Sequence, residues 1–157
     1  MGMAGLWNWS AAGRIEPERV QNALAGALER RVSEIGEGPP DALLCDVYHV
    51  HGDFPTLIDV YLAPDDLAEE TIASAVAVRL GADLLLSDDT LNPTRYVRAE
   101  PDGTLRAVHV DEVETDDGTE RRHVRACTGS DPACAAGPGC ADSRWKPAPP
   151  PGRSAAA

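Results

Sequence analysis

Apolar side chains recur four residues apart in the N-terminal part of the chain, as they do on the buried face of a helix. The positions are Val20, Leu24, Leu28 and Val32. Pro17 lies near the start of this stretch and Gly36 follows its end, and both positions favour a helix boundary. The pattern therefore predicts a helix over residues 16–35.

A second helix is predicted over residues 65–80, where acidic side chains come first and Gly81 follows the end. Between the two helices, residues 42–50 and 56–62 are rich in aliphatic and β-branched side chains and flank a short connection that contains Gly and Pro. Two such runs around a short turn predict a β-hairpin.

Further strands are predicted after the second helix. Residues 82–87 are almost all apolar, which favours a buried strand, and residues 94–100 and 104–114 flank the turn sequence Pro-Asp-Gly. One more strand can follow the turn at residues 116–118. The predicted fold class is α+β, with two helices packed on one mostly antiparallel sheet of four to six strands.

The composition changes from Thr128 onward, where ten of the last 30 residues are Pro or Gly and no apolar periodicity remains. Such a segment cannot bury enough apolar surface to offset the entropy of ordering it. We predict a single α+β domain over residues 1–127 and a disordered tail, rich in Pro, Gly and Cys, over residues 128–157.

The chain has 26 acidic and 14 basic residues, a net charge of −12, and the imbalance is concentrated in its middle. Residues 41–120 hold 19 acidic and four basic residues, a local balance of −15. Such a surface repels phosphate backbones and anionic lipids, so we expect neither nucleic acid nor membrane as a partner. It attracts a basic protein, mainly by raising the rate of association.

We expect acidic side chains of the C-terminal half to gather along one edge of the sheet and bind this basic partner. The predicted partner-binding residues are Asp88, Asp89, Tyr96, Glu100, Asp102, Asp111, Glu112, Glu114, Asp116 and Asp117. Tyr48 and Tyr61 can add aromatic contacts if they are exposed. A solvated acidic face, with the tyrosines in the core, is the alternative interpretation.

Two sets of residues have the chemistry of metal ligands. In the first, His49, His51 and Asp53 follow the pattern H-x-H-x-D, which opens the metal site of some zinc hydrolases. The histidine that would follow directly in those enzymes is absent, because Phe54 takes its position. We therefore interpret this segment as the end of a strand and a turn.

The second set is His123, Cys127, Cys134 and Cys140, four soft ligands within 18 residues that can hold a structural zinc ion. The intervals between these cysteines exceed the spacing of roughly two to four residues that is typical of zinc-binding cysteine pairs. Unliganded thiols in the tail are therefore the alternative, and the predicted function requires no cofactor.

No phosphate-binding loop and no hydrolase motif occurs in the sequence. We expect a non-enzymatic acidic binding protein, an inhibitor or immunity-type protein that blocks a basic partner such as a nuclease or deaminase toxin. The alternatives are a small metal-dependent enzyme that uses the H-x-H-x-D residues and an adaptor that binds through its Cys-rich tail. Without a signal sequence or a membrane-spanning run, the expected location is the cytoplasm, where cysteines stay reduced.

Overall fold

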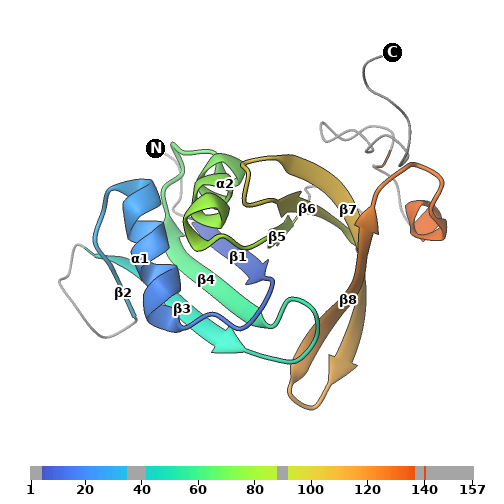
Figure 1. Ribbon diagram of the computed structural model, residues 1–157, viewed down its shortest axis with the longest axis horizontal. Helices are drawn as coiled ribbons and strands as arrows, with labels where there is room; N and C mark the ends of the chain where they lie inside the picture. The colour runs from blue at the N-terminus through green and yellow to red at the C-terminus, as the bar shows by residue number, and fades with distance from the viewer. Residues whose placement is uncertain (1–4, 35–41, 88–91, 137–139, 141–157) are drawn as a thin grey trace.

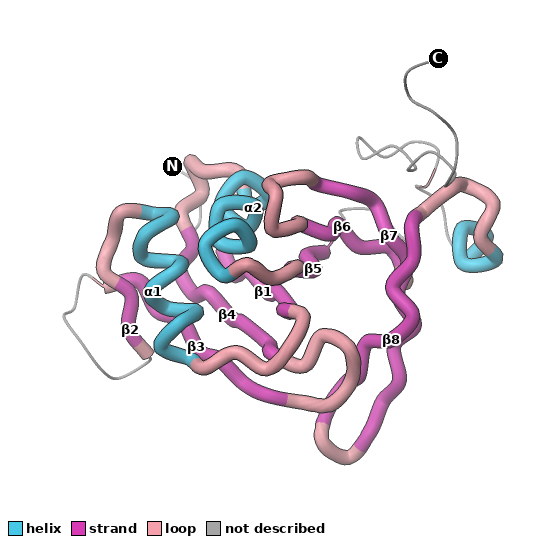
Figure 2. The backbone as a smooth tube through the Cα atoms, viewed as in Figure 1, coloured by secondary structure: helices cyan, strands magenta, loops and turns pink. Residues whose placement is uncertain are grey.

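The computed structural model describes residues 5–34, 42–87, 92–136 and 140, which form one eight-stranded sheet with two α-helices on one of its faces (Figure 1). Figure 2 shows the same arrangement by type of element. The helices are α1 (Pro17–Leu28), α2 (Glu69–Leu80) and the short 3-10 helix η1 (Pro132–Ala136). The strands are β1 (Gly5–Ala11), β2 (Val32–Ser33), β3 (Leu43–His49), β4 (Thr56–Ala63), β5 (Leu84–Ser87), β6 (Arg95–Ala99), β7 (Leu105–Thr115) and β8 (Gly118–Ala126).

The strands lie in the order β2-β3-β4-β1-β5-β6-β7-β8, so the prediction of four to six strands is wrong. The strands missed by the sequence pattern are β1 and β2. β1 comes first in the chain but lies between β4 and β5, antiparallel to both. β2 lies within the range predicted as helix, because Glu29 adopts a left-handed conformation that ends α1. Its parallel pairing with β3 makes the sheet mixed.

The main hydrophobic core lies between the two helices and the sheet. Val20 and Leu24 of α1 and Val76 of α2 are fully buried in one cluster with Ile58 and Val60 of β4. Burial of each of these side chains contributes about 1.5–3 kcal/mol. Both helices lie on one face of the sheet, and the opposite face of β3 and β4 carries no helix (Figure 1).

The connection between β3 and β4 ties this part of the sheet to β8 (Figure 1). Gly52 forms a parallel bridge with Arg121, and the Asp53 N–H donates a 2.9 Å hydrogen bond to the Arg121 carbonyl. Gly52 has φ 104°, and a Cβ atom there would lie 3.0 Å from the backbone nitrogen of Arg121. Only glycine fits this conformation and this approach without strain. We call the contact of Gly52 and Asp53 with Arg121 the Gly52 latch.

A second, smaller core forms on the face opposite the helices, where β7 and β8 curve toward the latch. Phe54, Leu85, Val108 and Val110 are buried together there. A β-bulge at His123 of β8 shifts the register and increases the bend of the ribbon.

The first part of the predicted tail lies against the end of β7 and β8. The Cys127 N–H donates a 2.9 Å hydrogen bond to the Ala107 carbonyl, and Cys140 is buried beside both residues. Residues 137–139 and 141–157 lie outside the described residues, so the predicted division at residue 128 and the predicted disorder stay predictions. None of the helices in the described ranges is long and apolar enough to cross a membrane.

Candidate metal centre and binding face

Four potential metal ligands meet at the end of the β7–β8 ribbon. They are His109 of β7, Cys127 directly after β8, Cys134 of η1 and Cys140. One ligand atom from each residue lies within 4.8 Å of all the others. Three of these residues are buried and Cys134 is partly buried. This group could therefore hold a metal ion.

The imidazole of His109 lies among the thiols. Its Nε2 atom is 3.2 Å from the Cys134 sulfur and 3.6 Å from the Cys140 sulfur, and the Cys127 and Cys134 sulfurs are 3.9 Å apart. Free thiols and an imidazole can share weak hydrogen bonds at these distances, and a cation can replace those bonds with direct ligation. We call this group the Cys3His cluster.

Hydrogen bonds on the far side of the imidazole assign its tautomer. The Thr94 backbone N–H and hydroxyl both donate to Oδ1 of Asn92, at 3.0 and 2.8 Å. The hydroxyl oxygen, 3.0 Å from Nδ1 of His109, therefore accepts the Nδ1 proton. Nε2 is left with its lone pair directed at the cysteines, which is the state a metal ligand needs. Asn92 also donates to the Ala133 carbonyl at 2.8 Å, which connects this network to η1.

Burial and neighbouring thiols shape the electrostatics of the cluster. Burial raises the pKa of Cys140 to about 12, and the adjacent Cys127 and Cys134 contribute in the same direction. Burial is the largest influence on the pKa of Cys127 and acts to raise it, but hydrogen bonds from the buried Arg95, the Gly129 backbone and Cys140, with the charge of Arg95, together lower the pKa. The guanidinium of Arg95 thus places a positive charge beside thiols that would become thiolates on binding a cation.

His123, the histidine predicted for this set, is not part of the cluster. Its Nδ1 atom lies 3.2 Å from Oδ2 of Asp111, and its side chain is 80% exposed. The reason is geometric: four residues of extended strand span about 13 Å, so His123 cannot reach the metal ligands around Cys127. His109 instead comes from the neighbouring strand, where it lies opposite Arg125.

The H-x-H-x-D residues do not converge on a common point. His49 Nε2 lies 2.7 Å from the Ile15 carbonyl, while His51 is exposed and 3.6 Å from Asp117. The backbone of Asp53 belongs to the Gly52 latch. These residues end a strand and form a turn, as the sequence interpretation held, and the turn also fastens β8.

The acidic residues predicted to bind a partner are spread over both ends of β7. Glu100 and Asp102 lie in the turn before this strand, and Asp116 and Asp117 lie in the turn after it. Eleven residues of strand between the turns separate the two pairs by about 35 Å. Asp88 and Asp89 lie outside the described residues.

The remaining predicted acids on β7 have partners on β6 and β8. Asp111 lies 3.1 Å from Arg125, which lowers the pKa of its carboxyl group. Glu112 accepts a hydrogen bond from the Tyr96 hydroxyl, and Glu114 accepts one of 2.7 Å from Thr119. The β8 ribbon thus offsets part of the negative charge that the sequence places in this region.

A different group of acids and tyrosines lies on the open face of β3 and β4. Asp46 and Asp59 are direct cross-strand partners, and Tyr48 and Tyr61 flank them. The two tyrosine hydroxyls are 3.4 Å apart, and each lies 3.4 to 3.5 Å from one of the carboxylates. This contact with Tyr61 is the main cause of a raised pKa at Tyr48, followed by burial and the charges of Asp46 and Asp59. We call these four residues the acidic tyrosine face.

Sequence reasoning considered His109 only as a further ligand for the H-x-H-x-D residues, and missed it as a partner of the cysteines. It also missed Asp46 and Asp59 as surface residues of interest. Strand alternation already places both aspartates and both tyrosines away from the apolar faces of their strands. The position of His109 could have been inferred from the turn at Asp116 and Asp117. If the strands on either side of this turn pair residue by residue, His109 pairs with a residue near Cys127.

The chain was compared with protein-family models, with curated proteins and with solved structures, and none of the three comparisons found a match.

Proposed function

We propose that the protein is a non-enzymatic binding protein that docks a basic protein partner on the acidic tyrosine face, while a zinc ion at the Cys3His cluster holds the C-terminal segment on the sheet. The observation that carries the binding role is the open sheet face itself, where Asp46 and Asp59 lie opposite each other beside two tyrosines. Like charges in this arrangement destabilise a sheet, and a cation from a partner would offset that repulsion.

The side chains on this face suit arginine and lysine. Tyr48 is 45% exposed, and tyrosine rings bind guanidinium groups through their π-faces. Leu6, which is 53% exposed, adds apolar surface on the neighbouring strand β1. Aromatic and apolar contact beside carboxylates is typical of the centre of a protein interface. The net charge of −12 would speed the approach of a basic partner, for which a nuclease or deaminase toxin is an example.

Zinc is supported by the donor set and the spacing of the cluster. Tetrahedral zinc with Zn–S bonds of about 2.3 Å and Zn–N bonds of about 2.0–2.1 Å separates two sulfurs by about 3.8 Å and a sulfur from a nitrogen by about 3.6 Å. The cluster has 3.9 Å between the Cys127 and Cys134 sulfurs, and 3.2 and 3.6 Å from His109 to Cys134 and Cys140. Zinc with three thiolates has a net charge of −1, which the neighbouring Arg95 would balance.

A closed set of four protein ligands supports a structural role rather than a catalytic one, because catalytic zinc keeps a position open for water or substrate. The cysteine outside the cluster, Cys45, is buried, and burial together with nearby Asp46 raises its pKa to about 12. Such a thiol is a poor nucleophile. A reducing location such as the cytoplasm suits this proposal, since oxidation of the thiols to disulfides would remove zinc ligands.

The binding proposal is tested with two double variants that change the net charge equally. Asp46→Asn with Asp59→Asn neutralises the acidic tyrosine face, and Asp65→Asn with Asp66→Asn neutralises two exposed acids in the loop before α2. Each immobilised protein is exposed to lysate of the native host, captured proteins are identified, and their affinity is measured at two salt concentrations.

We expect a basic protein that binds the wild type and the loop variant alike, and binds the face variant at least about tenfold more weakly with a reduced salt dependence. Equal loss of affinity in both variants would mean that only overall charge matters. Unchanged affinity in the face variant would place the partner elsewhere on the molecule.

A further inference from the structure

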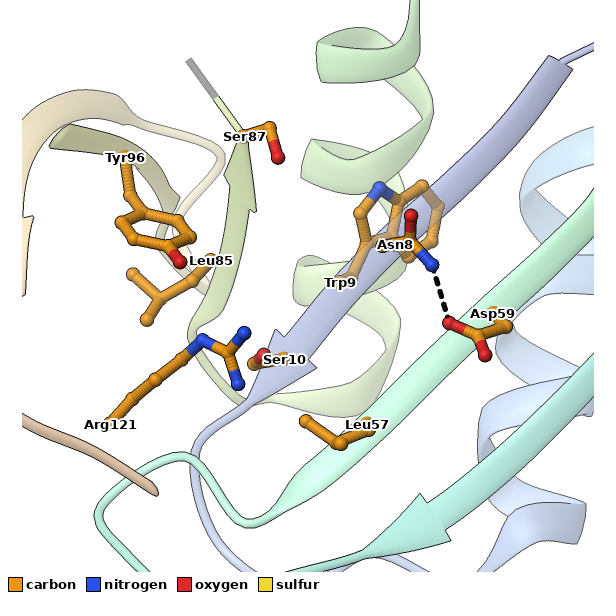
Figure 3. A pocket seen from close by; sticks show the side chains of 9 residues that line it. All are labelled: Asn8, Trp9, Ser10, Leu57, Asp59, Leu85, Ser87, Tyr96 and Arg121. Carbon is orange, nitrogen blue, oxygen red and sulfur yellow. Dashed lines mark hydrogen bonds between the residues drawn. The ribbon is translucent and has the colours of Figure 1, made fainter. Parts of the chain in front are cut away.

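A pocket of about 350 Å³ opens on the sheet face opposite the helices, in the concave region between β1, β5 and the curved β8 (Figure 3). Its walls include Leu57, Leu85 and Tyr96 on the apolar side and Asn8, Asp59 and Arg121 on the polar side. The volume falls within the range of small-molecule sites, which combine apolar walls with a few polar groups in fixed positions.

The guanidinium group of Arg121 extends from β8 into this pocket (Figure 3). Its Nε and Nη1 atoms are buried, and neither has a hydrogen-bond partner among the described residues. Its Cζ atom lies 5.9 Å from the centre of the Tyr96 ring. Donor atoms of a guanidinium that are buried without an acceptor are costly to the fold.

Backbone contacts of Arg121 fix the position of this residue at the edge of the pocket. The Gly52 latch binds the Arg121 carbonyl and places the connection between β3 and β4 beside it. The Tyr96 ring that borders the guanidinium is itself fixed, because its hydroxyl donates a hydrogen bond to Glu112. A positioned guanidinium loses little entropy on binding a ligand, which favours recognition.

We propose that this pocket binds a small organic monocarboxylate with an apolar or aromatic body, with Arg121 as the anchor for the carboxylate. The planar guanidinium donates two parallel hydrogen bonds to a carboxylate, and Nε is one of the donors of such a pair. Leu57, Leu85 and the Tyr96 ring would contact the body of the ligand. This site shares Asp59 with the acidic tyrosine face, but binding of a carboxylate at Arg121 does not depend on the binding of a basic protein partner.

The charges around Arg121 favour a monoanion over phosphate. Asp59 lies on the opposite side of the pocket, where it accepts a 2.6 Å hydrogen bond from Asn8. Glu112 accepts a hydrogen bond from the hydroxyl of Tyr96, whose ring borders the guanidinium of Arg121. Two carboxylates beside a single guanidinium repel a dianion more strongly than a monoanion. Phosphate sites usually supply more donors than one arginine.

The test is an NMR titration that follows the Nε–H signal of Arg121, whose side chain lines the pocket. The probes are phenylacetate, its neutral analogue phenylacetamide, and inorganic phosphate, each up to several millimolar. We expect a saturable shift of the Arg121 signal with phenylacetate, and binding at least about tenfold weaker for the amide and for phosphate.

Two variants of the pocket and one control complete the test. Arg121→Gln removes the anchor, and Ser87→Tyr fills the pocket without altering Arg121, so a folding defect in one does not decide the outcome. Arg122→Gln is the control, because Arg122 is its neighbour on β8 and pairs with Glu120 outside the pocket. We expect both pocket variants to lose phenylacetate binding and the control to keep it.

No saturable shift in the wild type, equal binding of the amide or of phosphate, or unchanged binding in Arg121→Gln would each overturn the proposal.

Discussion

The half of the sheet under the helices and the end formed by β7 and β8 are held together by different means. Under the helices, side chains such as Leu24, Val76 and Ile58 are fully buried in one large aliphatic core. At the other end, Ala107 and the cysteines form a small cluster, and much of the contact is polar. The first half is therefore stable through apolar burial, whereas the β7–β8 end buries less apolar surface in two smaller clusters.

This contrast explains where charges and potential ligands accumulate. Arg125 reaches Asp111 at 3.1 Å and Asp131 at 2.6 Å, so it joins β7, β8 and the segment before η1. These carboxylates are held ionised, since their hydrogen bonds with Arg125 lower the pKa of Asp111 and bring that of Asp131 to about 2. Partly exposed pairs of this kind contribute little stability singly, which leaves the Cys3His cluster as the main candidate for fixing this end.

The largest effect is expected from removing the zinc ion that we propose for the Cys3His cluster. Structural zinc sites in zinc-finger peptides have apparent binding free energies of about 10–16 kcal/mol, so treatment of reduced protein with a chelator should release the segment from Cys127 to Cys140. Hydrogen exchange measured by mass spectrometry should then speed up in β7, β8 and η1 and stay slow in α1. If the exchange rates in β7, β8 and η1 are the same before and after chelation, this end of the sheet needs no metal.

A cavity in the core under the helices should lower the stability of the fold without affecting metal binding. Leu24→Ala removes a fully buried side chain from the main core and is expected to lower the free energy of unfolding by about 2–5 kcal/mol. Metal content should remain unchanged, because no ligand is near. The measurement is denaturant unfolding with metal analysis of the same sample. Loss of metal in Leu24→Ala would mean that the two regions are not independent.

An intermediate effect is expected from breaking the Gly52 latch, which connects the two regions. Gly52→Ala forces a Cβ atom against the Arg121 backbone at positive φ and should cost about 1–3 kcal/mol. For a chain of this length that lowers Tm by roughly 2–12 °C. The control is Gly5→Ala, since a Cβ atom at Gly5 meets nothing within 4 Å. Equal Tm values for the two variants would contradict the assigned role of the latch.

The smallest effect on stability is expected on the open face. Asp46→Asn with Asp59→Asn removes a cross-strand repulsion but also weakens hydrogen bonds with Asn8 and Tyr61, so the free energy of unfolding should change by less than about 1 kcal/mol. Thermal unfolding of the double variant checks this. A fall of several kcal/mol would show that these acids serve the fold, and their proposed role in binding would lose its support.

Local patterns predicted the helices and most strands, because burial against one core imposes a clear period. The four-residue repeat around Leu24 indicated α1, and the alternation in residues 56–62 indicated β4. β1 was not predicted, because its neighbours β4 and β5 are distant in sequence. Only the assembled sheet shows that Trp7 and Trp9 lie on its buried face. Such long-range pairing leaves little local signal.

The candidate sites depended on register, which is harder to infer from sequence than the presence of a strand. The three cysteines of the cluster were recognised, but proximity along the chain suggested His123, whereas the antiparallel pairing of β7 with β8 places His109 beside the thiols. Likewise, the acids of β7 were recognised as a group before the arginines of β8 were known to lie beside them.

Metal analysis of two histidine variants tests whether the Cys3His cluster binds zinc through His109. Wild type, His109→Asn and His123→Asn are purified under reducing conditions without added metal, and zinc is measured per chain. Asparagine tolerates the positive φ of His123, so that variant changes the side chain without backbone strain. We expect about one zinc ion per chain in the wild type and in His123→Asn, and almost none in His109→Asn. A wild-type protein without zinc, or zinc that is lost with His123 and kept without His109, would contradict this expectation.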